Sequence, residues 1–185
     1  AEDLGAYEHA NTWTGSVSAD WTTAANWSSN IVPVSGRSPI IINVTNDPDI
    51  STDVSLKNIT INSGAILDIN SSGSLSLSDD FSNNGTVTLN SDSDEFASLI
   101  VQGTSSGNIT YKRYVSDEGT DEWDLIGSPV VGQTISNFVS ANSSLATSGS
   151  DYAIGVFSND GSTDTASAMY SMLSSADLSG SLSSG

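Results

Sequence analysis

Carboxylates are the side chains of this sequence that offer the most chemistry. They gather in short stretches typical of loops, such as SDSDE at residues 91–95 and SDEGTDE at residues 116–122. Calcium takes about six to eight oxygen ligands, so a site for it needs such a density of carboxylates. Calcium is therefore a candidate ligand, with a plain solvated acidic surface as the alternative, since no stretch matches a complete EF-hand loop. The candidate metal ligands are Asp47, Asp49, Asp53, Asp92, Asp94, Glu95, Asp117 and Asp121.

The sequence offers few combinations of residues that could form a catalytic site. The single histidine, His9, has no neighbouring motif that would set up a nucleophile and a base. A glycosidase needs two carboxyl groups, which residues 79–80 and 94–95 would offer. These residues lie in polar stretches where water keeps them ionised, because a raised pKa would require burial. We therefore expect a protein that is not an enzyme, with no catalytic residue and no cofactor other than calcium.

The composition argues against several classes of partner. Four Lys and Arg against 22 Asp and Glu give a formal net charge of −18, which disfavours nucleic acids and anionic membranes. The 185 residues include no cysteine, which excludes disulfides and thiolate sites. No apolar run approaches the roughly 18 residues of a membrane span. The first residues, AEDLGAYEHA, resemble a mature end left after cleavage of a signal peptide, which favours export.

Three of the four tryptophans, Trp13, Trp21 and Trp27, precede the regular part of the sequence. Exposed indoles would form a platform on which a sugar could stack. The alternative is a cap, because a stack of β-coils needs an atypical terminal unit that covers its open end. Their position just before the regular strands favours the cap.

Apolar residues recur at every second position from Arg37 to Val115, which is the period of a β-strand. The linkers at residues 62–64, 70–73 and 82–85 each end on glycine, where we expect a tight turn with positive φ. The residues expected to point inward are Ile59, Ile61, Leu67, Ile69, Leu75, Leu77, Val87, Leu89, Leu99, Val101, Ile109 and Tyr111.

Two all-β architectures fit this pattern. A β-sandwich would use the turns as hairpins, whereas a β-solenoid would use them as corners, with roughly 16 to 24 residues in each coil. We predict a short right-handed β-solenoid, because the serine-lined run GSLSLS at residues 73–78 then needs no hairpin partner; the sandwich is the alternative. The predicted domains are a Trp-rich N-terminal cap (1–36), the β-solenoid (37–115) and a second β unit with a Ser/Gly-rich tail (116–185). Residues 134–145 would include one helical turn.

The order of these segments resembles the repetitive surface and adhesin-like proteins that Bacteroidetes bacteria export through the type IX secretion system. The resemblance covers about residues 11–160 and is carried by the TWTG…DW…NW…P segment at residues 12–33, the Gly/Asn-cornered strands and LIGSPV at residues 125–130. It implies secretion, residence on or outside the cell, and a part in adhesion, gliding or a surface matrix. The C-terminal sorting domain of that family is missing here, which suggests a fragment or a processed product of a longer protein.

We therefore expect a secreted, non-enzymatic structural or adhesion protein of the cell surface. Its partners would be surface glycans, other surface proteins or further copies of itself in a homo-oligomer, without insertion into a membrane. The alternative is an accessory or carbohydrate-binding segment of a secreted polysaccharide-degrading enzyme. Asp164-Thr165-Ala166 resembles the signal at which Bacteroidetes O-glycosylate exported proteins, so Thr165 is a candidate acceptor. We also expect Trp123 and the strand that follows it to fold back over the last coil.

Overall fold

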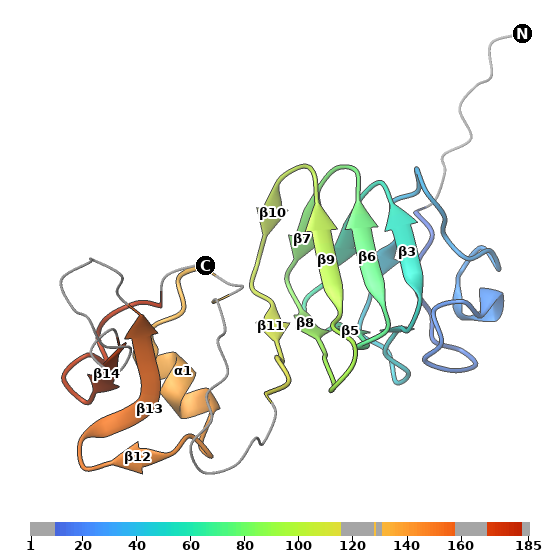
Figure 1. Cartoon of the computed structure of the whole chain (residues 1–185). Coiled ribbons are helices and arrows are strands. Elements are labelled where there is room, and N and C mark those ends of the chain that lie inside the picture. Colours follow the sequence, from blue (N-terminus) through green and yellow to red (C-terminus); the bar gives the residue numbers. More distant parts are fainter. Residues whose placement is uncertain (1–9, 116–127, 129–130, 158–169, 183–185) are drawn as a thin grey trace, which may run out of the picture. The chain divides into compact units, whose positions relative to one another are not determined.

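The computed structural model describes residues 10–115, 128, 131–157 and 170–182 (Figure 1). The chain divides into two compact units, Ala1–Asp124 and Leu125–Gly185. The expected boundary at residue 116, the expected return of Trp123 over the last coil and the candidate acceptor Thr165 all lie outside the described residues.

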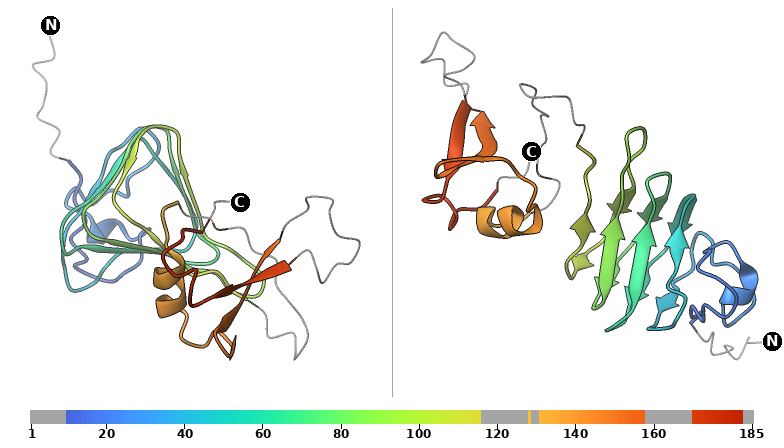
Figure 2. Two further views of the ribbon diagram at one scale, coloured as in Figure 1. Left: turned by 90° about the vertical axis from the view of Figure 1, so that its left-hand side faces the viewer. Right: turned by 90° about the horizontal axis from the view of Figure 1, so that it is seen from below.

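The first unit is a short β-solenoid of parallel strands, which confirms the predicted fold class and rules out the sandwich. Its strands are β1 (Ile40–Ile41), β2 (Asp49–Ile50), β3 (Asp53–Leu56), β4 (Ile59–Ile61), β5 (Ile66–Ile69), β6 (Ser74–Leu77), β7 (Phe81–Asn83), β8 (Thr86–Leu89), β9 (Ser98–Val101), β10 (Ser105–Ser106) and β11 (Thr110–Tyr111). They form three sheets, ordered β1-β4-β7-β10, β2-β5-β8-β11 and β3-β6-β9. Viewed along the stack, the coils outline a triangle with one sheet on each side (Figure 2, left).

The coils differ in length, which hides the repeat in the sequence. The interval along the sequence between two residues paired across neighbouring coils is not constant. It is shorter for Asp49 and Asp68 than for Ser74 and Ser98. All of these intervals fall inside the predicted range. Because the corners absorb the differences, the strands stay in register although no fixed period is visible.

The core lies inside the triangle and is built as predicted. The expected inward residues of β4, β5, β6 and β8 are almost wholly buried. Those at the last coil, Leu99, Val101, Ile109 and Tyr111, are partly buried against the same core. Successive side chains of a strand point to opposite faces, so every second residue enters the core, and truncating one such side chain to alanine costs about 2–5 kcal/mol.

The corner glycines serve two purposes, of which the sequence suggested one. Gly64 has a φ of +78° and forms the expected tight turn. Gly73 and Gly85 do not lie in the left-handed region, so the expectation was wrong for them. A Cβ on Gly85 would collide with the carbonyl oxygen of Ala65, and one on Gly73 with that of Ile50. These two glycines are required because the backbone of the preceding coil passes so close.

The second unit contains a three-stranded antiparallel sheet of β12 (Thr147–Ser148), β13 (Asp151–Phe157) and β14 (Tyr170–Ser174), in that order. The helical turn expected within residues 134–145 is α1 (Ile135–Ala141). Thr134 caps it, because its Oγ1 accepts the N–H of Asn137 at 3.1 Å. Within the part of the chain that the structure describes, no helix has the length and apolar character needed to span a bilayer.

Candidate functional site

The tryptophan-rich segment forms an irregular first coil that extends two of the sheets. Thr12 pairs in parallel with Ile40 of β1, and Asp20 pairs in parallel with Asp49 of β2. A short 3-10 helix, η1 (Ala24–Asn26), follows Asp20 in the chain. The segment therefore covers strand edges that would otherwise be open to another chain.

The three indoles pack together under this first coil. Trp13, Trp21 and Trp27 are each at most 1% exposed. Trp27 meets the other two rings edge to face, at centroid distances of 5.0 and 4.7 Å. The Nε1 of Trp13 donates to the carbonyl oxygen of Asn46 at 2.8 Å. A sugar stacks only on an exposed ring, so this burial contradicts the glycan-contact reading of the tryptophans and supports the cap.

Asn26 organises the cap, and we did not identify it from the sequence. It is fully buried. Its Oδ1 accepts the N–H groups of Val17 and Ser18, at 2.9 and 3.0 Å. Its Nδ2 donates to the carbonyl oxygen of Asp20 at 3.0 Å. The side chain thus satisfies backbone groups that the irregular coil leaves without strand partners. An asparagine in a segment rich in Ser, Thr and Asn gives no sequence signal for such a role.

Three of the predicted calcium ligands, Asp49, Asp53 and Asp92, accept hydrogen bonds from protein donors. Asp49 accepts from the side chains of Ser51 and Asn70, at 3.0 and 2.7 Å. Asp53 accepts from the hydroxyl of Ser74 at 2.6 Å. Among the described residues, no three acidic or histidine side chains are grouped so that they could hold a metal ion. The remaining candidates Asp117 and Asp121 lie outside those residues.

Hydrogen bonds between coils favour the ionised form of two exposed carboxylates. The Ser71 hydroxyl, followed by the N–H of Asp94, lowers the pKa of Asp92. The hydroxyl and the N–H of Thr104 lower the pKa of Asp80. In each case a donor on one coil binds a carboxylate on another, at 2.5 Å for the Ser71 hydroxyl and 2.7 Å for that of Thr104. These aspartates therefore link successive coils.

A column of like charges runs up the sheet that contains β2 and β5. Asp20 is in register with Asp49, and Asp49 is in register with Asp68. Neighbouring strands lie about 4.8 Å apart, so like charges face one another. Beside the column, burial raises the pKa of Asp47, and the charge of Asp68 adds to the effect. The Oδ1 of Asp47 is buried without a hydrogen-bond partner among the described residues.

The carboxylates considered for glycoside hydrolysis are not brought together. Residues 79–80 follow β6, whereas residues 94–95 precede β9, which is parallel to it, so they lie at opposite ends of the strands in the sheet β3-β6-β9. A four-residue strand spans about 13 Å. Catalytic carboxyl pairs lie roughly 5 to 10 Å apart.

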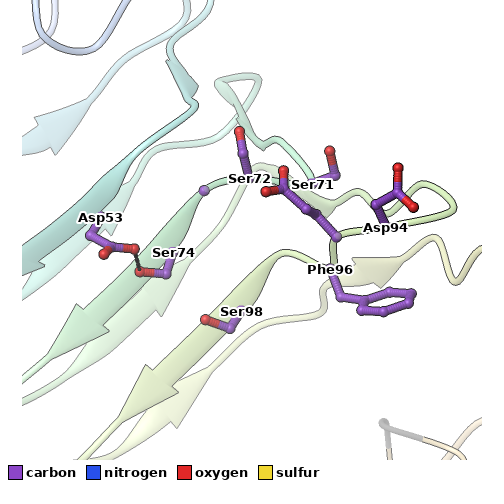
Figure 3. A pocket seen from close by; sticks show the side chains of 9 residues that line it. Asp53, Ser71, Ser72, Ser74, Asp94, Phe96 and Ser98 are labelled. Carbon is purple, nitrogen blue, oxygen red and sulfur yellow. Dashed lines mark hydrogen bonds between the residues drawn. The ribbon is translucent and has the colours of Figure 1, made fainter.

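One open groove lies where the sheet β3-β6-β9 meets the loop at residues 91–97 (Figure 3). Its floor is the outward face of the sheet, where Asp53, Ser74 and Ser98 stand in register on successive strands. The corner between β5 and β6 and the acidic loop before β9 form its sides. The groove is lined by Asp53, Ser71, Ser72, Gly73, Ser74, Asp94, Glu95, Phe96 and Ser98.

The chemistry of this groove is that of a polar binding surface with one aromatic ring. The N–H groups of Asp94 and Glu95 donate to Oδ1 of Asp92, each at 2.9 Å. This turn fixes the loop backbone, while the two carboxylates have no side-chain partner among the described residues. Phe96 is 44% exposed, and the guanidinium carbon of Arg113 lies 3.9 Å from its ring centroid. Three of the eight predicted metal ligands, Asp53, Asp94 and Glu95, thus line the same groove.

The comparisons with known proteins give one match. A family described as a domain of unknown function (DUF8693) matches residues 12–173. No curated protein and no solved structure matches the chain.

Proposed function

The chain belongs to the DUF8693 family, and we propose that it is a secreted, non-enzymatic structural and adhesion module of the cell surface. The single observation that carries this proposal is a solenoid whose first end is closed by a buried tryptophan cap. A closed end prevents uncontrolled strand pairing, and stacked coils form a scaffold that displays side chains at fixed spacing.

The bonds between coils suit a protein that works outside the cell. Side chains link coil to coil without disulfides, as in the hydrogen bond from Asn70 to Asp49 at 2.7 Å and that from Ser74 to Asp53 at 2.6 Å. They therefore do not depend on the redox state of the surroundings. The net charge of −18 favours solubility and keeps copies apart at low salt.

Surface labelling of producing cells tests the location. Intact cells and lysed cells are stained with an antibody raised against the whole chain, with a cytoplasmic protein as the control. We expect equal staining of intact and lysed cells, because an exported surface module is accessible without lysis. Staining that appears only after lysis would refute the proposed location.

The second candidate function is an accessory carbohydrate-binding segment of a secreted polysaccharide-degrading enzyme. The groove favours it, because Asp94 and Glu95 offer free carboxylates beside the exposed ring of Phe96. The sequence of the full-length gene product discriminates between the two. A catalytic domain in the same polypeptide would support the accessory role, whereas further surface modules would support the first proposal.

A further inference from the structure

We propose that the groove between the sheet β3-β6-β9 and the loop at residues 91–97 binds a neutral, hydroxyl-rich saccharide. This inference rests on the proposed surface function, since it names the ligand through which the module would adhere. The groove is the feature in the described part of the chain where free acceptors, hydroxyl groups and an exposed aromatic ring occur together.

The floor of the groove presents oxygen atoms at a repeated spacing. Asp53, Ser74 and Ser98 are in register on β3, β6 and β9, so they follow one another at about 4.8 Å. Ser74 donates to Oδ1 of Asp53 at 2.6 Å. That bond holds the carboxylate in place and leaves Oδ2 to accept from a ligand. The hydroxyl of Ser98 has no partner among the described residues and can both donate and accept.

The side of the groove is a preorganised loop. Both oxygens of Asp92 are used within the protein, since Oδ1 accepts two N–H groups of the loop and Oδ2 accepts the Ser71 hydroxyl. As a result, Asp94 and Glu95 are held by their backbone while their carboxylates stay free. A carboxylate accepts two hydroxyl groups at once, and such charge-assisted bonds are stronger than neutral ones.

The rim supplies an apolar contact. Phe96 is 44% exposed, and Arg113 lies against its ring at 3.9 Å, which fixes the ring by a cation–π contact. An aromatic ring held in this way can pack against the C–H face of a pyranose, as aromatic side chains do with flat apolar surfaces. In Figure 3 the ring points away from Asp53 and Ser74, so it would contact the part of an oligosaccharide that extends past the loop.

Charge selects the class of saccharide. Asp53, Asp94 and Glu95 surround the groove, and the whole chain carries a net charge of −18, so a polyanionic glycan would be repelled. The acidic side chains flank the groove on two sides and are not grouped as a metal ion would require. A neutral oligosaccharide satisfies the free acceptors without adding charge.

The test is a titration of the whole ¹⁵N-labelled chain, followed by NMR, with cellohexaose, mannohexaose, xylohexaose and maltohexaose as neutral probes. Hexagalacturonate is the anionic comparison. We expect saturable shifts at Gly73, Ser74 and Ser98 with at least one neutral probe, and none with hexagalacturonate. Asp94→Asn and Phe96→Ala should each weaken binding roughly tenfold. The matched controls Asp68→Asn and Phe157→Ala, which lie outside the groove, should change it less than roughly twofold.

Three results would overturn the inference. They are the absence of saturable shifts with all four neutral probes at millimolar concentration, saturable shifts confined to residues outside the groove, and binding that appears only after calcium is added. None of these results would alter the surface labelling of cells. Failure of the saccharide site and failure of the proposed location are therefore distinguishable.

Discussion

The indoles of Trp21 and Trp27 meet edge to face, with ring centroids 4.7 Å apart and planes inclined by 77°. The Nε1 of Trp27 also donates to the carbonyl oxygen of Trp21 at 3.0 Å. One residue pair thus combines an aromatic contact with a hydrogen bond to backbone that would otherwise be buried unpaired. This pair therefore contributes to the packing of the cap.

Trp27→Ala should lower the free energy of unfolding by about 3–5 kcal/mol, because it leaves a large cavity under the first coil. Urea denaturation of the whole chain, followed by far-UV circular dichroism, measures the loss. Val17→Ala is the control, since Val17 lies in the same cap but is 62% exposed. Equal losses for the two variants would show that the cluster does not hold the cap.

Gly85→Ala should destabilise the solenoid, whereas Gly155→Ala should have little effect. A Cβ on Gly85 would meet the backbone carbonyl oxygens of Ala65 and Asn62, which cannot move without shifting a coil. The nearest neighbours of a Cβ on Gly155 would be side-chain atoms, the first of them in Tyr170 at 3.3 Å, and not backbone. The thermal unfolding midpoint measures both. A midpoint unchanged by Gly85→Ala would mean that the coils are not packed as closely as described.

Asp68→Asn should raise the free energy of unfolding by about 0.2–1 kcal/mol at neutral pH, because it removes a like charge opposite Asp49. The gain should shrink in about 1 M salt, which screens exposed charges. Asp94→Asn removes the same charge from a loop outside the column and is the control. A gain of equal size for the control would mean that net charge, and not the column, determines the effect.

The bonds from Thr104 to Asp80 predict a loss of stability in acid. They lower the folded-state pKa of Asp80 below the unfolded value of about 3.9, so their contribution is complete above that pH. The contribution is lost as the pH falls through the lowered pKa. Asp80→Asn should therefore cost more stability at about pH 6 than at about pH 2.5. Urea midpoints at the two pH values measure this, and a pH-independent cost would contradict it.

Asp47 should show the opposite dependence. Burial raises its folded-state pKa, with a further contribution from Asp68, so its protonated form favours folding. That contribution is present below the unfolded pKa and is lost as the pH rises through the raised value. Asp47→Asn should therefore stabilise the chain more at about pH 6 than at about pH 3. The same urea titration detects the change. A larger gain in stability at the lower pH would contradict a raised pKa of Asp47.

The alternation of apolar residues was enough to predict the solenoid core. Leu75 and Leu77, for example, enter the core because every second residue of a strand must. The reason for Gly85 could not be predicted, since it depends on Ala65 and Asn62 of another coil. Predicting such contacts requires the register between neighbouring coils, and corners of unequal length hide that register in the sequence.

The candidate site was predicted only in part, for the same reason. Neighbouring acidic residues suggested calcium because the sequence shows only neighbours along the chain. The fold instead places Asp53 beside Ser74 and Ser98, which come from three different coils. The exposed ring of Phe96 joins them through a loop whose shape depends on Asp92. Only the stacked structure brings these groups into one groove.

The central claim, that the chain binds saccharides without converting them, is tested most directly by frontal affinity chromatography. The four neutral hexasaccharides pass over the immobilised whole chain, and the eluate is identified by mass spectrometry. We predict that at least one hexasaccharide is delayed and that all are recovered intact. Elution of shortened products, or of every hexasaccharide without delay, would contradict the claim.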